Sequence, residues 1–210
     1  MDRIVQYLQE KYRPRALLVY GSYVRGDQDG FSDFDCMVIV DSKEKNHDDS
    51  VVDGVQLDCY IFTADEVSEE DVDPYITAYD SRIVFDDGIG ASLKERVRKY
   101  VAEHTVTEES EKEFIASWIR KTVRRMEKGD DEGNFRGLVF LSGSLADYCS
   151  LRDLFCFGSK KTIALLRETD PEGYRLFHDA VTLKTNDSIR AWAEHVVKGC
   201  RRDGSSGYLL

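Results

Sequence analysis

The stretch GSYVRGDQDGFSDFDCMVIV, residues 21–40, constrains the fold of this chain most strongly. It opens with a Gly-Ser turn and closes with an apolar run, at whose start Asp33 and Asp35 stand one residue apart. A third aspartate, Asp58, lies inside a later apolar run, VQLDCYIF. Carboxylates on or beside buried strands are costly unless a cation pairs with them. The arrangement therefore indicates a site for a divalent metal ion at a sheet.

The spacing of the aspartates determines how they can share a metal. Side chains at i and i+2 of a strand point to the same face, and the rise per residue places Asp33 and Asp35 roughly 6–7 Å apart. In VQLDCYIF, the apolar residues alternate with the polar ones, so Asp58 can face the same metal if the two strands are neighbours. Hard oxygen ligands of this kind suit Mg²⁺ or Mn²⁺.

The Gly-Ser turn predicts what such a metal would carry. Gly21 and Ser22 follow the strand-like run ALLVY, residues 16–20. Glycine permits close backbone approach to a phosphate, and the serine hydroxyl can donate a hydrogen bond. We expect residues 22–26 to open a short helix, whose N-terminus favours anions. Arg25 could add a fork of donors to a phosphate oxygen.

The pattern of the chain changes near residue 90. Before it, strand-like runs at 16–20, 35–40, 55–62 and 82–85 follow a helical segment at 1–12. After it, apolar residues at three-to-four spacing predict helices over 92–104, 111–129, 135–155, 159–169, 171–183 and 188–199. We therefore predict an N-terminal α/β domain over residues 1–90 and a C-terminal helical domain over residues 91–210.

Composition narrows the classes of partner and compartment. The net charge of −11 over 210 residues makes the chain a poor general binder of nucleic acid. We see no signal peptide in the charged residues 1–12, and no run approaches the roughly 18–20 apolar residues of a membrane-spanning helix. The cysteines are odd in number and share no metal spacing, so we expect reduced, buried thiols and a cytoplasmic protein. They are Cys36, Cys59, Cys149, Cys156 and Cys200.

Taken in order, these residues resemble the DNA polymerase beta-like nucleotidyltransferase superfamily. Its pattern is a Gly-Ser, a short helical segment, an Asp-x-Asp pair and a third carboxylate on a later strand. The motif covers about residues 15–62 and is similar in style to the small bacterial aminoglycoside and lincosamide nucleotidyltransferases. The resemblance implies an α+β fold, in which a mixed-sheet nucleotidyltransferase domain is followed by an all-helical bundle domain.

The resemblance also implies an activity and a set of roles. A nucleoside monophosphate, usually AMP from ATP, would pass to a hydroxyl of a small acceptor, with release of pyrophosphate. Asp33, Asp35 and Asp58 would bind Mg²⁺ or Mn²⁺, and Gly21 and Ser22 would hold the triphosphate. The acceptor could be an aminoglycoside- or lincosamide-like antibiotic, and a homodimer is plausible because relatives place acceptors between subunits.

The identity of the general base stays open. A carboxylate beside metal ions keeps a low pKa, because nearby positive charge favours its ionised form. Asp58 would therefore be a weak base, and a carboxylate of the helical domain such as Asp147 is the alternative. No histidine receives a role, and His47 falls in a polar loop, DSKEKNHDDS, between two strands.

Two basic groups in the helical half could line a cleft. Lys160 and Lys161 stand at the start of a predicted helix and could neutralise the β- and γ-phosphates. For Lys121, Arg124 and Arg125, in the run IRKTVRRMEKG, the favoured interpretation is a solvated helix end. We expect the aromatic pair at 114 and 118, spaced i,i+4, to belong to the core.

Two other functions remain possible on the same fold. One is adenylylation of a protein or RNA partner, as in an antitoxin-like enzyme. The other is a catalytically silent module that binds a nucleotide. The presence of all three carboxylates disfavours the silent module, and the sequence names neither the acceptor nor the nucleotide base.

Overall fold

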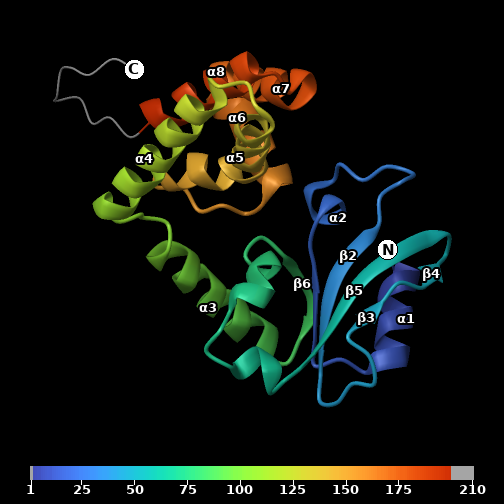
Figure 1. The fold of residues 1–210 in the computed structure, drawn as a ribbon. Coiled ribbons are helices and arrows are strands. Elements are labelled where there is room, and N and C mark those ends of the chain that lie inside the picture. The colour runs from blue at the N-terminus through green and yellow to red at the C-terminus, as the bar shows by residue number, and fades with distance from the viewer. Residues whose placement is uncertain (1, 200–210) are drawn as a thin grey trace. The chain divides into compact units, whose positions relative to one another are not determined.

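A computed structural model of the chain describes residues 2–199 (Figure 1). Residue 1 and residues 200–210, among them Cys200, lie outside the described part. The chain splits into two compact units, Met1–Val101 and Ala102–Leu210. The first contains a mixed sheet and the second is helical, which confirms the predicted fold class.

The first unit is built on one sheet with the strand order β3-β5-β2-β1-β6, and β4 pairs with β5 at its margin. Strands β2 and β5 are parallel, whereas the other pairs are antiparallel. The elements are α1 (Asp2–Tyr12), β1 (Ala16–Val19), α2 (Ser22–Arg25), β2 (Phe34–Val40), β3 (His47–Asp48), β4 (Val51–Val52), β5 (Val55–Thr63), the 3₁₀ helices η1 (Glu66–Ser68) and η2 (Asp73–Ala78), β6 (Arg82–Asp86) and α3 (Ile89–Glu103).

Strand alternation separates the core of this unit from its candidate site. Helix α1 buries Ile4 and Leu8 against the face of the sheet that carries Cys36 and Cys59. Side chains at odd offsets from these cysteines point to the opposite face. Asp35 on β2 and Asp58 on β5 therefore lie on the face away from α1.

The second unit packs its helices around one aromatic core. Its helices are α4 (Glu109–Met126), α5 (Asp131–Ser150), α6 (Ser159–Thr169), α7 (Pro171–Leu183) and α8 (Asn186–Lys198). Trp192 is fully buried, donates from its indole Nε1 to Ser144 Oγ at 2.8 Å and stacks on Tyr148 with ring centroids 5.7 Å apart. Satisfying the buried indole N–H in this way removes its desolvation cost.

Two local expectations were wrong. The polar loop around His47 contains the short strand β3, which pairs with β5. Phe114 was expected in the core, yet it is 72% exposed, because the buried stripe of α4 runs through Ala116, Ile119 and Val123. Trp118 is 36% exposed, and its ring centroid lies 6.2 Å from that of Phe140 at the edge of the core.

Two further sequence expectations concern membranes and thiols. No helix within residues 2–199 has both the length and the apolar character needed to span a bilayer. Cys36, Cys59, Cys149 and Cys156 are free thiols, and the first three are buried.

Candidate active site

The Gly21–Ser22 turn is pressed against Asp35. Gly21 adopts φ 71° and ψ −149°, a region that side-chain-bearing residues rarely enter. A Cβ atom added at Gly21 would lie 2.0 Å from Asp35 Oδ2 and 2.7 Å from its Cγ. The backbone N–H of Tyr20 donates to the carbonyl oxygen of Asp35 at 3.0 Å, which ties the end of β1 to the start of β2. Glycine is therefore required here for the turn and the carboxylate to meet.

The short helix predicted after the turn is present as α2. The N–H groups of Val24 and Arg25 both reach the Gly21 carbonyl oxygen at 3.3 Å, and Gly26 ends the helix in the left-handed conformation. Ser22, the first residue of α2, is buried, with 7% of its surface exposed. This one-turn helix sets the direction of the chain between β1 and β2.

The parallel pairing of β2 and β5 brings two of the predicted aspartates side by side. Asp35 and Asp58 are direct Cα partners in this register. Because partners on neighbouring strands point to the same face, both carboxylates lie on the face away from α1. Asp33 is exposed and lies one residue before β2, two residues before Asp35. The sheet thus places Asp35 and Asp58 on one face, and Asp33 precedes β2 in the chain.

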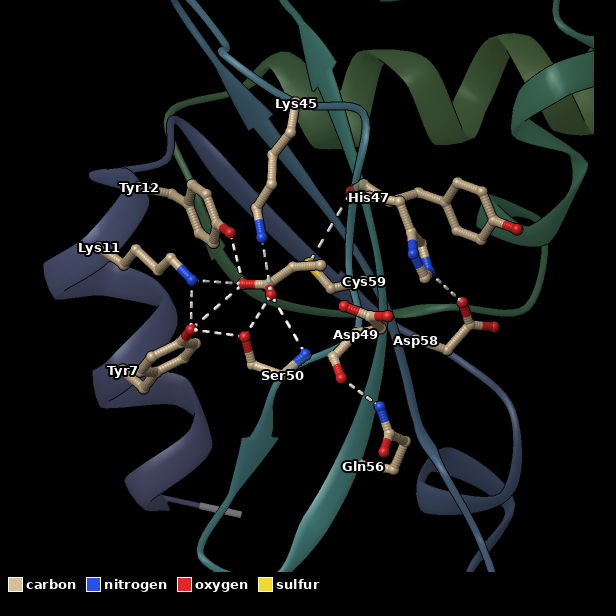
Figure 2. A network of polar contacts seen from close by, with 12 residues as sticks. Tyr7, Lys11, Tyr12, Lys45, His47, Asp49, Ser50, Gln56, Asp58 and Cys59 are labelled. Atoms are coloured by element: carbon tan, nitrogen blue, oxygen red, sulfur yellow. Dashed lines mark hydrogen bonds and ion pairs between the residues drawn. The ribbon is translucent and has the colours of Figure 1, made fainter.

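The donor set suits a hard divalent cation, but the side chains are not gathered around one point. Within residues 2–199, no group of three His, Cys, Asp or Glu side chains is placed closely enough to hold a metal ion. The carboxylate of Asp58 is instead directed at His47, with Asp58 Oδ1 2.7 Å from His47 Nε2 (Figure 2). Binding a cation would require the Asp58 side chain to share or exchange this contact.

His47 is a site residue that sequence reasoning missed. It lies on β3, pairs with Tyr60 on β5 and packs its ring 4.9 Å from the Tyr60 ring. The His47 ring and the Asp58 carboxylate are about equally exposed, at 40% and 38%. The position of His47 depends on the two-residue strand β3, which lies between polar residues and is too short to show a periodic pattern of apolar residues.

The residue next to His47 anchors this edge of the sheet. Asp48 pairs with Cys59 on β5, so its side chain points to the α1 face, opposite to that of His47, and it is fully buried. Its carboxylate accepts from Lys11 Nζ at 2.9 Å, from Ser50 Oγ at 2.6 Å and from the Tyr12 hydroxyl, and it pairs with Lys45 Nζ at 2.8 Å. Fixing Asp48 in this cluster leaves His47 on the Asp58 side of the strand.

The Asp48 cluster explains how a carboxylate is tolerated in the interior. Burial by itself would raise the pKa of Asp48, but hydrogen bonds from Lys45, Ser50, Tyr12 and Lys11 outweigh it and hold this pKa well below its usual range. The carboxylate is therefore ionised at neutral pH. Its interactions contribute stability above the pKa of an unfolded aspartate, and this contribution declines as the pH falls below about 4.

The predicted phosphate-binding cations occupy varied settings. Arg25 on α2 donates from Nε to Asp27 Oδ2 at 3.2 Å and pairs through Nη2 with Asp27 Oδ1 at 3.1 Å. Lys160 and Lys161 belong to the second unit and stand in the first turn of α6. The Nζ atom of Lys161 lies 4.9 Å from the centroid of the Phe157 ring. Their predicted roles toward a nucleotide remain predictions.

Asp147, the alternative base, has an unusual protonation equilibrium. It lies in the second unit near the end of α5 and is partly buried. Desolvation by burial raises its pKa to about 6, with no other contributing cause. A carboxyl group with such a pKa is a stronger base than a solvated aspartate.

Comparison with known proteins gives one clear result. Residues 1–100, slightly less than half of the chain, match the profile of the family described as Nucleotidyltransferase domain. A search of curated proteins gives no match. Among solved structures, a nucleotidyltransferase-like protein from Exiguobacterium sibiricum 255-15 is similar at 13% sequence identity and a TM-score of 0.34, over 92% of this chain and 71% of that one.

Proposed function

We propose that this chain is a Mg²⁺-dependent nucleotidyltransferase that transfers AMP from ATP to a hydroxyl group of a small acceptor. The nucleotidyltransferase domain in residues 1–100 supports the reaction class. The observation that carries the proposal is the meeting of Gly21 with Asp35, beside the in-register partner Asp58. It joins a turn suited to phosphate with carboxylates suited to a divalent cation.

The reaction is an in-line displacement at the α-phosphorus of the triphosphate. The acceptor oxygen forms a bond to this phosphorus, the bond between the α-phosphorus and the bridging oxygen breaks, and pyrophosphate leaves with the bonding electrons. The hydroxyl proton passes to a base. A hydroxyl group has a pKa far above neutral, so it is a poor nucleophile without such a base.

Asp33, Asp35 and Asp58 are the residues that would hold Mg²⁺, because their carboxylate oxygens are the ligands this ion prefers. When bound, the ion would screen the phosphate charge and help to ionise the acceptor hydroxyl. Gly21 and Ser22 would orient the triphosphate through backbone N–H groups and the serine hydroxyl. Arg25, Lys160 and Lys161 are the cations proposed to neutralise its outer phosphates.

Two carboxylates compete for the role of base. Asp58 is placed beside Asp35, and its contact with His47 orients one of its oxygens. Asp147 has a pKa raised to about 6 by burial. If Asp147 is the base, kcat falls as the pH drops below about 6 and this dependence disappears in Asp147→Asn, which would leave only a low, flat activity.

The proposed acceptor is an aminoglycoside- or lincosamide-like antibiotic. The net charge of −11 favours a polycationic acceptor over a polyanionic one. The phosphate chemistry described above does not depend on the identity of the acceptor or on the oligomeric state of the protein. A panel of hydroxylated cationic antibiotics is therefore the first set of acceptors to test.

The test compares the wild-type protein with the double variant Asp33→Asn/Asp35→Asn. Purified protein, α-labelled ATP, Mg²⁺ and the acceptor panel are incubated, and labelled acceptor and pyrophosphate are measured. We expect the double variant to lose at least about 10²–10³-fold in turnover. Asp41→Asn is the matched control, because Asp41 follows the far end of β2 and its side chain is 83% exposed.

Several outcomes would contradict the proposal in different ways. Full activity of the double variant would remove the carboxylates from the mechanism. Label that appears only on protein or RNA after addition of a cell lysate would replace the small acceptor by a macromolecule. ATP binding by calorimetry without transfer to either class would indicate a catalytically silent domain.

A further inference from the structure

A groove lined by cationic side chains lies between α4 and α8 of the second unit, where these helices pack against each other. Its volume is about 410 Å³. The lining residues are Ser117, Arg120, Lys121, Val123, Arg124, Glu127, Arg190 and Glu194, and we call it the α4–α8 groove.

Helix geometry creates this concentration of charge. Positions three and four residues apart share one face of a helix, so Arg120, Lys121 and Arg124 project together from α4. Such like-charged neighbours repel each other when no anion lies between them. With Arg190 from α8 they give four cations against two carboxylates, in a chain whose overall net charge is −11.

The cations that α4 contributes to the groove have no side-chain partners among the residues that the structure describes. Among residues 2–199, the side chains of Arg120, Lys121 and Arg124 make no hydrogen bond or ion pair. Arg125, the next residue on α4, lies outside the groove lining and is paired with both Glu132 and Asp130. Within the described residues, the fold therefore pairs the neighbouring cation and leaves the three groove cations of α4 without an ion pair.

Arg190 provides an independent indication of a missing acceptor. Its Nη1 lies 3.4 Å from Asp187 Oδ1, whereas its Nε atom is buried and has no hydrogen-bond partner in the described part of the chain. A buried donor without a partner is destabilising, and native proteins rarely keep one without a function or a bound group. A small turn of the guanidinium toward an anion in the groove would supply the acceptor.

We propose that the α4–α8 groove binds a small phosphate-bearing ligand. Three arginines and a lysine around a hollow are the donors that recognise phosphate, since guanidinium groups contact its oxygens in pairs. The volume lies in the range of small-molecule sites. The proposal does not rest on the nucleotidyltransferase reaction, because no residue that lines the groove has a proposed role in that reaction.

Calorimetric titration of the full-length protein with inorganic pyrophosphate tests the groove. EDTA is included, so that any metal-dependent phosphate binding by the aspartates of the first unit is suppressed. We expect saturable binding to the wild-type protein and an affinity at least about tenfold weaker in Arg124→Gln and in Arg190→Gln. Binding should weaken as salt is added, because the groove cations are partly exposed.

Two controls separate this site from other cations and from the proposed active site. Arg175→Gln removes an arginine of α7 that pairs with Asp179 at 3.1 Å, and it should bind pyrophosphate like the wild type. Asp33→Asn/Asp35→Asn should also bind normally, even though it is expected to lose turnover. If Arg190→Gln does not fold, Arg124→Gln still tests the site, because Arg124 is exposed and unpaired within the described residues.

The absence of saturable binding, or equal binding by both groove variants and the wild type, would overturn the proposal. Titration with adenosine monophosphate then compares a nucleotide with the inorganic anion. A short single-stranded RNA is the last probe. If it binds far more tightly than either small ligand and displaces pyrophosphate, the groove is a nucleic-acid site and the small-ligand assignment is wrong.

Discussion

Replacing Gly21 by alanine is the sharpest test of the site geometry. The added methyl group would lie 2.0 Å from Asp35 Oδ2, whereas ordinary van der Waals contacts begin near 3.4 Å. The carboxylate oxygen must therefore move by more than 1 Å, or the turn must open. Either change separates the phosphate-binding backbone from the carboxylate that the proposed reaction requires.

The size of the effect follows from two contributions. The Gly21 conformation, φ 71° and ψ −149°, costs alanine about 1–3 kcal/mol of folding free energy. A displacement of about 1 Å in a reacting group costs about 10²-fold in rate. We therefore expect Gly21→Ala to lower kcat/KM about 100-fold and to reduce the free energy of unfolding by about 2–3 kcal/mol.

Gly26→Ala is the matched control. Gly26 also has a positive φ, 81°, but a Cβ atom there would meet nothing within 4 Å. It should lose about 1 kcal/mol of stability from backbone strain and keep nearly all activity. Pyrophosphate release under Mg²⁺ and urea unfolding provide the two measurements.

The comparison can refute the argument in a simple way. Gly21→Ala with wild-type kcat/KM would mean that contact between the turn and Asp35 is not needed for turnover. Equal losses of activity in the two variants would assign the effect to backbone strain, because only the first variant meets the carboxylate.

Three further perturbations have expected outcomes. Asp48→Asn should lower the free energy of unfolding at pH 7 by about 2–4 kcal/mol, because a buried carboxylate with several hydrogen bonds is lost. The decline of this free energy below about pH 4 should also become smaller than in the wild type. Urea unfolding measures both effects. Asp147→Asn should stabilise the protein by about 1–2 kcal/mol at pH 8 and change its stability little at pH 4. Burial raises the pKa of Asp147 to about 6, so ionisation of this carboxyl group above that pH opposes folding. Equal effects at both pH values in a thermal unfolding series would contradict this. His47→Ala should reduce kcat about tenfold in steady-state assays, because the contact that orients one oxygen of Asp58 is lost. The melting temperature should change only slightly, since exposed pairs contribute at most about 1 kcal/mol. A wild-type kcat would show that the contact has no part in turnover.

Local signals in the sequence carry the parts of the fold that were predicted closely. The helices at 159–169 and 171–183 begin and end where the sequence placed them, at Ser159–Thr169 and Pro171–Leu183. Asp170 caps the second of them by accepting from the backbone N–H of Gly173. A short polar cap and a proline at the first turn are readable because they act within a few residues.

Strand pairing was predictable only in part. The apolar runs identify β2 and β5, and their alternation indicates the face of Asp58. The register that makes Asp35 and Asp58 partners depends on contacts between segments more than 20 residues apart, which no local pattern fixes. Edge strands as short as β3 add no periodicity, and so the place of His47 beside Asp58 could not be inferred.

Buried charge was the least predictable feature, because its stability depends on partners brought together by the tertiary fold. Asp48 lies in the most polar stretch of the first unit, yet its side chain is fully buried by groups from α1 and its own loop.

The same cluster has a consequence for the site. Asp48 and His47 are adjacent on β3 and point to opposite faces, so fixing one restricts the other. A loosened Asp48 cluster would therefore release His47 and, through it, the Asp58 carboxylate. Stability and turnover should fall together in Asp48→Asn, whereas His47→Ala should lower turnover alone; this difference separates anchoring of the strand from positioning of the carboxylate.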